Sequence, residues 1–351
     1  MSNVLMLSAI VMLVLLFFKV PVFIAVLGGS MVYFVMNPGI NTVIFAQQAI
    51  IGTEKISLMA IPFFVCAGIF MNYTGVTKRI MDFCEVVTGR LPGGLAQVNV
   101  LLSTVMGGLS GSNIADAAME SKMMVPEMTK KGFSLEFSSV VTAASSMITP
   151  LIPPGIAMIL YGCIANVSIG KLFISGLGVG GLLCVSMMIL VGVVSKKRGY
   201  GILTTEKLTW SKFWSALKLL PIIIIGGIRI GVFTATEAGA VAILYAAFLG
   251  IIYHEMHVKD MIQGLKETVC TTASIMLIVS AASVFSWILT KERIPQALTA
   301  WMLANIHSKY VFLIVVNIFL LIVGMFIEGN ASMIILVPLL APIAAQYGIN
   351  E

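Results

Sequence analysis

Charged residues are scarce in this sequence. Asp, Glu, Lys and Arg make up only 10% of the 351 residues, whereas hydrophobic residues make up 59% and the mean hydropathy is +1.05. A soluble domain carries roughly 25% charged residues, so this composition excludes an ordinary soluble protein and predicts a chain divided into membrane spans. No basic stretch with interleaved aromatic residues occurs. The excess of Lys and Arg (21) over Asp and Glu (15) is therefore more typical of cytoplasmic loops than of nucleic-acid binding.

Residue types that carry catalysis or bind metals are also few. The five cysteines lack CxxC spacing, which favours reduced, buried thiols. No GxxxxGK[ST] motif for nucleotide hydrolysis occurs. We therefore expect no enzyme activity and no organic cofactor. The first apolar run lacks a basic leading region and a small-residue cleavage site, so we expect a retained membrane helix there rather than a signal peptide.

Long apolar runs dominate what is present. A full membrane crossing needs about 20 apolar residues, and the runs suited to spanning are 4–36 (with a break near Lys19–Pro21), 56–73, 133–166, 168–195, 217–253 and 267–289. Two further runs, about 96–130 and 309–347, carry polar or glycine interruptions. These two predict re-entrant helical hairpins.

The first hairpin holds the most informative segment, GGLSGSNIADAAMESKMMVPEMTKKG, which begins at Gly107. The apolar runs on either side of its Gly/Ser/Asn cluster are too short to span comfortably. Non-helical backbone at membrane depth survives only where protein or an internal cavity surrounds it. The segment therefore predicts a binding site inside the membrane, at a hairpin tip formed by Ser110, Gly111, Ser112 and Asn113.

A second polar interruption, TAASSMITPLIPPG, begins at Thr142. Its three prolines remove backbone donors and predict a broken helix over about 133–166. The break exposes carbonyl oxygens beside the hydroxyls of Ser145, Ser146 and Thr149, a combination suited to a sodium ion, and Pro150 opens it. The half-helix that follows offers its N-terminus to an anion. The alternative is a simple proline kink whose hydroxyls bond back to carbonyls.

Three acidic residues fall at the predicted interruptions. Asp116 and Glu120 share one helix face, and Glu328 lies in the second hairpin. Ionisable groups at membrane depth are functional candidates. Structural pairing of Asp116 and Glu120 with Lys122 is the alternative to a direct role in binding ions or protons.

Two further sequence features have competing interpretations. Arg229 is the most deeply placed basic residue, and it either pairs with Glu237 or senses the charge of a substrate. Residues 108–111 also fit the GxSG motif of rhomboid intramembrane proteases. That chemistry needs an embedded histidine, whereas all three histidines fall in polar connections, so this motif weakly supports an enzyme.

The two halves of the chain resemble each other. In each half, a turn containing threonine leads to a charged amphipathic helix, an interrupted apolar run and a Val-Pro pair. Thr290 follows Thr74 by 216 positions, and Pro338 follows Pro126 by 212. Chance similarity between apolar segments is the alternative, but repeats with broken helices are typical of secondary transporters. The predicted organisation is a first repeat, a polar linker and an incomplete second repeat: residues 1–195, 196–212 and 213–351.

The repeat also predicts a length. The first copy continues past Pro126 to about Lys196. A complete second copy would then end near residue ~408, whereas this sequence ends at Glu351. We therefore expect the second repeat to be truncated.

An ordered series of motifs along nearly the whole chain resembles the large membrane subunit of TRAP (tripartite ATP-independent periplasmic) transporters. The motifs include LPGGLAQV, GGLSGSNIADAA, TAASSMITPLIPPGIAMILYG and FTATEAGAVA. The resemblance implies an all-α polytopic membrane protein with two inverted repeats and an elevator mechanism. It implies a sodium-driven importer of an organic acid, such as a C4-dicarboxylate, sialic acid or sugar acid, in the bacterial inner membrane. It also implies two partners, a small membrane subunit and a soluble periplasmic substrate-binding protein.

The resemblance also assigns site residues, with sodium as the coupling ion. The first hairpin and the broken helix would form one sodium site and one wall of the substrate pocket, through Ser110, Gly111, Ser112, Asn113, Asp116, Ser145, Ser146, Thr149 and Pro150. The second hairpin would contribute to a second sodium site through Gly324, Glu328, Asn330 and Ser332. The alternative functions are a sodium/dicarboxylate symporter that needs no binding protein and a channel.

Overall fold

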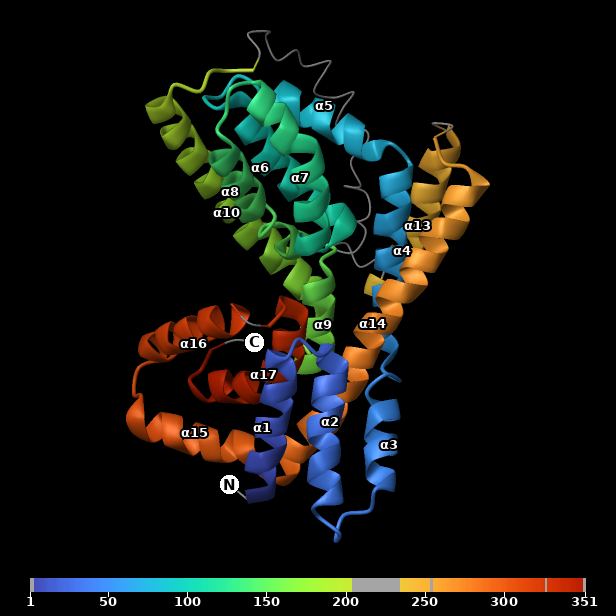
Figure 1. Ribbon diagram of the computed structural model, residues 1–351, viewed down its shortest axis with the longest axis vertical. Coiled ribbons are helices and arrows are strands. Elements are labelled where there is room, and N and C mark those ends of the chain that lie inside the picture. Colours follow the sequence, from blue (N-terminus) through green and yellow to red (C-terminus); the bar gives the residue numbers. More distant parts are fainter. Residues whose placement is uncertain (1–2, 204–233, 253–254, 326, 350–351) are drawn as a thin grey trace. The chain divides into compact units, whose positions relative to one another are not determined.

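The computed structural model describes residues 3–203, 234–252, 255–325 and 327–349 (Figure 1). The residues described are helical or lie in turns, and no strand occurs among them, so the all-α prediction is confirmed for this part of the chain. The chain divides into two compact units. Unit 1 comprises Met1–Leu58, Leu160–Val167 and Thr271–Glu351, and unit 2 comprises Met59–Ile159 and Ser168–Cys270. The predicted repeat boundaries concern internal symmetry and stay a prediction.

Unit 2 contains the first hairpin and most of the broken helix. Its helices are α4 (Ala60–Tyr73), α5 (Val76–Thr88), α6 (Gly94–Ser110), α7 (Asn113–Lys130), α8 (Leu135–Ser145), the short η2 (Thr149–Leu151), the start of α9 (Ile156–Ala165), α10 (Ile169–Arg198), α13 (Ala235–Ile252) and the first part of α14 (Val258–Lys291). Helix α6 packs against α5, α7, α8 and α10, while α4 pairs with α13.

Unit 1 contains the two ends of the chain and the second hairpin. Its helices are α1 (Asn3–Phe17), α2 (Val22–Val35), α3 (Val43–Ile51), η1 (Ile56–Met59, of which the first three residues belong to this unit), the end of α9, the second part of α14, α15 (Ile294–Asn305), α16 (Lys309–Gly324) and α17 (Gly329–Gln346). The rings of Phe312, near the start of α16, and Tyr347, after the end of α17, stack with centroids 4.6 Å apart. The two arms of the second hairpin are therefore antiparallel.

The first apolar run breaks where the sequence predicted. Helix α1 ends before Lys19 and α2 begins after Pro21, so the run forms two short helices that pack on each other. The Ser8 hydroxyl donates to the Gly29 carbonyl at 2.6 Å. A Cβ atom at Gly29 would lie 2.8 Å from the Met12 Cβ, so glycine allows this close approach.

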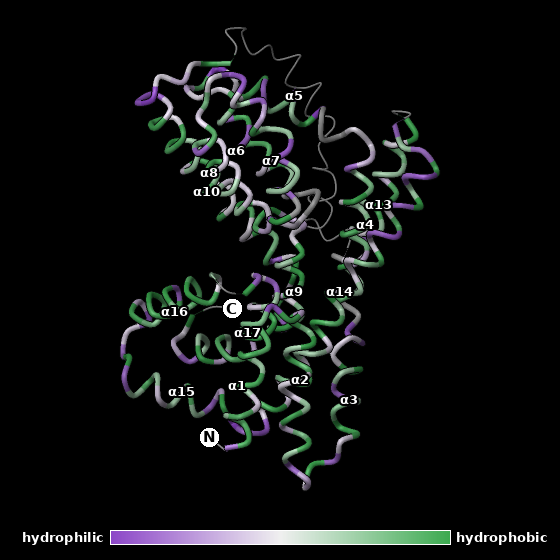
Figure 2. Tube along the Cα trace, in the orientation of Figure 1, coloured by the Kyte–Doolittle hydropathy of each residue, from purple (hydrophilic) through white to green (hydrophobic). Residues whose placement is uncertain are grey.

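Among the described residues, four segments are long and apolar enough to cross a membrane if the bent pair counts as one. Helices α10, α14 and α17 qualify singly, and residues Leu135–Leu151 with Ile156–Ala165 qualify together, with a bend of 44° between them. The predicted broken helix is confirmed. Hydrophobic residues cover most of α1 and α16 (Figure 2), and side chains such as Leu321 on α16 and Leu182 on α10 are exposed. Lipid is the natural contact for such surfaces.

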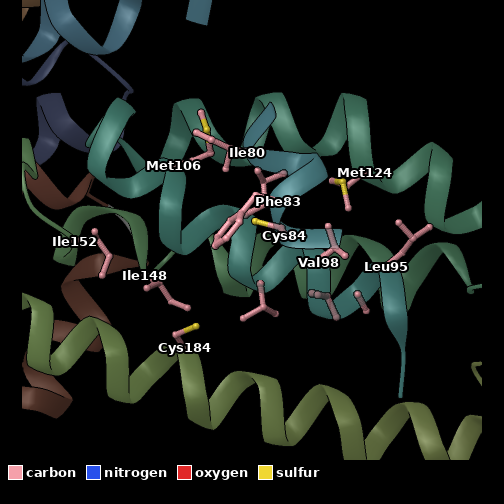
Figure 3. Close-up of a cluster of buried hydrophobic side chains, with 14 of the residues drawn as sticks. Ile80, Phe83, Cys84, Leu95, Val98, Met106, Met124, Ile148, Ile152 and Cys184 are labelled. Atoms are coloured by element: carbon pink, nitrogen blue, oxygen red, sulfur yellow. The ribbon is translucent and has the colours of Figure 1, made fainter. Parts of the chain in front are cut away.

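The core of unit 2 lies around α6 (Figure 3). It brings together Phe83 and Cys84 of α5, Met106 of α6, Ile148 beside the break and Cys184 of α10, all buried. These contacts seat the first hairpin against α5 and α10 by apolar burial, and the Gln97 side-chain amide adds a hydrogen bond to the Met188 carbonyl of α10 at 2.9 Å. The hairpin therefore has a fixed position within its unit.

The cysteines follow the sequence prediction with one exception. None of the five forms a disulfide; four are buried, whereas Cys270 is exposed. Cys270 neighbours Val269, which is 66% exposed on the outward face of α14. The prediction of a buried thiol was wrong there because composition does not reveal which face of an apolar helix packs inward.

An aromatic contact joins the end of α10 to the start of α8. The Ser134 backbone N–H donates to the Tyr200 hydroxyl at 3.1 Å, and the Tyr200 ring lies against Phe133 and Phe137, with centroids 4.5 and 5.3 Å away. Hydrogen bonding from Ser134 lowers the pKa of Tyr200. This contact fixes the beginning of the helix that leads into the break.

Candidate functional site

The first hairpin turns at a glycine. Helix α6 ends at Ser110, and Gly111 adopts φ +59°, the left-handed conformation that commonly ends helices. The Gly111 N–H donates to the Gly107 carbonyl at 3.2 Å, and the Asp116 N–H donates to the Ser112 carbonyl at 3.1 Å as α7 begins. The structure thus has a helical hairpin that turns at the predicted Gly/Ser/Asn cluster, while its re-entry into the membrane and its role as a binding site stay predictions.

The hairpin lies directly against the break of the next helix. A Cβ atom at Gly107 would lie 2.8 Å from the Thr149 carbonyl oxygen, and one at Gly111 would lie 3.0 Å from the Pro154 carbonyl oxygen. Both positions are too crowded for a larger residue without movement. The structure thus brings together the tip and the break, two segments that the sequence identified separately.

The hydroxyls at the break do not all behave alike. Ser145 donates to the Thr142 carbonyl at 3.1 Å and Ser146 donates to the Ala143 carbonyl at 3.0 Å. Both are buried, and both bond back to their own helix, as the proline-kink alternative predicted for them. Thr149 differs because its hydroxyl bonds to residues of α6 and α7 and not to its own helix.

Thr149 binds a carboxylate of the hairpin. Its hydroxyl oxygen lies 2.7 Å from Asp116 Oδ2 and 3.3 Å from the Ser103 carbonyl oxygen. Asp116 is 1% exposed and Thr149 is 0% exposed. Electrostatic contacts are stronger in such a low-dielectric setting than in water. This hydrogen bond joins the second arm of the hairpin to the break.

A second buried carboxyl lies one turn further along α7. Both Glu120 oxygens contact the Ser103 hydroxyl, at 2.9 and 2.7 Å, and Glu120 is 0% exposed. On α6, one turn before Ser103, the Asn99 side-chain amide donates to the Thr142 hydroxyl at 2.7 Å. The other amide atom, Asn99 Oδ1, is buried without a partner. Lys122, the pairing partner considered from the sequence, is exposed.

Sequence reasoning missed the polar stripe on α6. Asn99, Ser103, Gly107 and Gly111 follow one another at intervals of four, which places them on one helix face. This face contacts the broken helix and α7. The spacing was visible in the sequence and would have identified Asn99 and Ser103 as candidate site residues.

The second hairpin presents a different arrangement. The Glu328 carboxylate is exposed and accepts from the Ala331 N–H at 3.2 Å, so it caps the start of α17. The Ser332 hydroxyl is buried without a partner, Asn330 is half-buried, and a Cβ atom at Gly324 would meet open space. The first hairpin tip belongs to unit 2 and the second to unit 1.

Two sequence hypotheses concern residues near α13. Arg229 lies outside the described residues. Its considered partner, Glu237, accepts from the Thr234 N–H at 2.7 Å, while the Glu237 N–H donates to the Thr234 hydroxyl at 3.3 Å. Such a reciprocal pair is a capping box, so Glu237 has a structural role at the start of α13.

Long apolar helices, a helical hairpin and a proline-broken helix with buried polar side chains between them define a helical membrane protein of the transporter class. The comparison with known families identifies the class further. Residues 9–351 match the family described as tripartite ATP-independent periplasmic transporter, DctM component. The chain belongs to this family.

Named relatives come from several bacteria. The chain is 38% identical to the sialic acid TRAP transporter large permease protein SiaM of Vibrio cholerae, over 96% of this chain and 80% of the relative. It is 36% identical to the C4-dicarboxylate TRAP transporter large permease protein DctM of Pseudomonas aeruginosa, over 85% and 71%. It is 35% identical to the 2,3-diketo-L-gulonate TRAP transporter large permease protein YiaN of Escherichia coli, over 88% and 73%.

These findings confirm the family resemblance and decide one alternative. The relatives are permease components of transporters and not enzymes. The GxSG motif at residues 108–111 therefore does not mark a rhomboid protease. It instead forms the last turn of α6 and the start of the hairpin tip.

Proposed function

We propose that this protein is the permease subunit of a sodium-coupled importer of an organic acid anion, working in the bacterial inner membrane. A small membrane subunit would assemble with it, and a soluble periplasmic binding protein would deliver the acid. The hairpins and broken helices would move together as the transport domain of an elevator. The substrates for which the relatives are named support an acid substrate, since sialic acid, diketogulonate and C4-dicarboxylates all carry carboxylates.

The hydrogen bond between Thr149 and Asp116 carries the proposal for sodium. A small hard cation takes oxygen ligands, and a proline break supplies carbonyl oxygens that a regular helix would use internally. Asp116 adds negative charge at this buried position, and its contact with Thr149 fixes the hairpin tip next to the break. Sodium would bind among oxygens of residues 110–113 and 149–150.

The proposal for the acid depends on the half-helix after the break. Helix α9 begins at Ile156, directly after Pro154 and Gly155, and runs for 10 residues. The first backbone N–H groups of a helix have no partner within it and carry a partial positive charge. These N–H groups can therefore bind an anion such as a carboxylate. A Cβ atom at Gly111 would lie 3.0 Å from the Pro154 carbonyl oxygen and 3.2 Å from the Ile156 nitrogen, so the hairpin tip lies beside the start of α9.

A second sodium ion would bind at the second hairpin. The unpartnered, buried Ser332 hydroxyl supports this assignment, because a buried polar atom without a partner is costly. Asn330 lies on the same first turn of α17. Glu328 would contribute less directly, since its carboxylate caps the helix.

Uptake into proteoliposomes tests the proposed function. The chain would be reconstituted with the small membrane subunit and the binding protein of the same bacterium, and labelled sialic acid, succinate and diketogulonate would be offered with an inward sodium gradient. Saturable uptake that needs sodium and the binding protein is expected. Equal uptake without the binding protein would instead indicate a symporter of another type. Non-saturating flux without sodium dependence would indicate a channel.

A further inference from the structure

Unit 1 contains a pocket of about 340 Å³, and none of the residues that line it belongs to the proposed sodium sites. Ligand pockets in proteins commonly start near ~300 Å³. Its walls come from the end of α3, the following segment, the end of α9, and the inner faces of α14 and α17. All the lining residues belong to unit 1.

Hydrogen-bond donors gather on the walls of this pocket. Gln48, Lys55, Ser283, Ser286 and Trp287 all line it, and each carries a side-chain donor. Thr290 also lines it, but its hydroxyl already donates to the Ser286 carbonyl at 2.9 Å. Among the described residues, no hydrogen-bond partner is found for the side chains of Gln48, Ser283, Ser286 or Trp287. The pocket therefore offers several unused donors.

Lys55 supplies the charge. Its ammonium donates to the Cys163 carbonyl at 2.8 Å, at the last turn of α9. An ammonium has three hydrogens, so two stay available after this bond. The lining contains no aspartate or glutamate. The net charge of the pocket wall is therefore positive.

The rest of the wall is apolar. Its apolar side chains are Leu58, Ile164, Val279, Ala282, Ile334 and Pro338. Gly52 lets α3 approach α14 closely, since a Cβ atom there would lie 2.5 Å from the Ser283 Cβ. A ligand that fits must combine an anionic head for Lys55 with an apolar body.

From these contacts we propose that unit 1 binds a carboxylate with a short apolar body, with Lys55 and Gln48 holding the carboxylate. This site shares no residue with the proposed sodium and substrate site of unit 2. The inference does not depend on the proposed transport function, because it concerns binding in the absence of any ion gradient.

Binding of octanoate to the full chain in phosphatidylcholine nanodiscs tests the proposal. Trp287 lines the pocket and reports on its occupancy by fluorescence once the other three tryptophans, Trp210, Trp214 and Trp301, are replaced by phenylalanine. We expect the Trp287 fluorescence to change saturably as octanoate is added and to stay unchanged with octylamine. A second nanodisc preparation, with oleic acid in the bilayer, tests whether the pocket takes its carboxylic acid from the membrane or from water. Weaker octanoate binding there assigns the pocket to acids from the membrane, and unchanged binding assigns it to acids from water.

Matched variants locate the site. Lys55→Gln should weaken octanoate binding by about tenfold or more, as expected for loss of a charge-assisted hydrogen bond, and Lys55→Arg should retain it. Lys309→Gln, at an exposed lysine of the same unit outside the pocket, should change nothing. Gln48→Leu leaves the bond from Lys55 to Cys163 intact and should also weaken binding, so it decides the matter if Lys55→Gln fails to fold.

Three results would overturn the proposal. The first is the absence of a saturable response to octanoate. The second is an equal response to octylamine, which would show a merely apolar pocket. The third is unchanged octanoate binding in folded Lys55→Gln and Gln48→Leu proteins.

Discussion

The Thr149 hydroxyl donates a 2.7 Å hydrogen bond to Asp116 Oδ2, and this contact links the second arm of the first hairpin to the break between α8 and α9. Both side chains are buried. The carboxylate is therefore held by a donor from the neighbouring element at the point where helical backbone ends. This relationship holds the first hairpin against the break, where we propose a single sodium site.

Thr149→Val removes the donor and nearly preserves the side-chain shape. We expect the sodium concentration for half-maximal uptake to rise roughly tenfold, because a buried carboxylate that loses a hydrogen bond costs about 1–3 kcal/mol. Thr149→Ser should keep most of the sodium dependence. The control is Thr129→Val, whose hydroxyl donates to the Val125 and Pro126 carbonyls within α7. Equal sodium dependence in the Thr149→Val and wild-type proteins would contradict this role.

Gly107→Ala tests the close packing of hairpin and break. The new methyl group would lie 2.8 Å from the Thr149 carbonyl oxygen, and overpacking of this kind costs about 1–3 kcal/mol. We expect a lower midpoint of thermal unfolding in detergent together with impaired uptake. Gly181→Ala on α10 is the matched control, since a Cβ atom there meets nothing within 4 Å. It should be neutral or slightly stabilising, and a loss of stability of equal size at both positions would argue against the packing account.

Ser103→Ala removes the hydroxyl that contacts both Glu120 oxygens. Loss of the partner of a buried carboxyl should destabilise the protein by about 1–3 kcal/mol. Chemical denaturation in detergent, monitored by circular dichroism, measures this effect. Ser121→Ala is the control because its exposed hydroxyl bonds only to the Ala117 carbonyl of its own helix. If the two variants unfold alike, the contact between Ser103 and Glu120 does not stabilise the hairpin.

Tyr200→Phe separates the hydrogen bond from the aromatic packing at the start of α8. The variant keeps the ring between Phe133 and Phe137 but loses the acceptor for the Ser134 N–H. We expect a loss of about 1 kcal/mol in the free energy of unfolding, and a larger loss for Tyr200→Ala, which also removes the ring. Equal stability of the two variants would show that the ring contributes nothing there.

Backbone chemistry explains which parts of the site were predictable. The break followed from three prolines within five residues, because proline restricts the backbone and removes a hydrogen-bond donor. The hairpin turn followed from Gly111, because glycine can adopt left-handed conformations. These effects are local, so a sequence displays them directly. The pairing of Thr149 with Asp116 is not local, and only the family resemblance placed the two segments in one site.

Other features were not foreseen because they depend on side-chain surroundings. The Glu328 carboxylate caps α17, which the sequence did not indicate, and its contribution to a sodium site stays a prediction. Asn99 and Ser103 were overlooked because each was taken as a single polar residue in an apolar run, and their spacing of four along one helix face was not considered. The joining of residues 1–58 with residues 271–351 in unit 1 arises from contacts between distant segments, which no local pattern displays.

The central claim is that the hairpin tip and the break bind sodium, and site-directed labelling tests it most directly. Ile114, 61% exposed beside the tip, would be changed to cysteine in a Cys270→Ser background, since the other native cysteines are buried. We predict that sodium, but not potassium, slows maleimide labelling of Ile114→Cys, while labelling at the exposed Asn305→Cys in unit 1 stays the same. Equal labelling rates at Ile114→Cys in sodium and potassium would contradict the account.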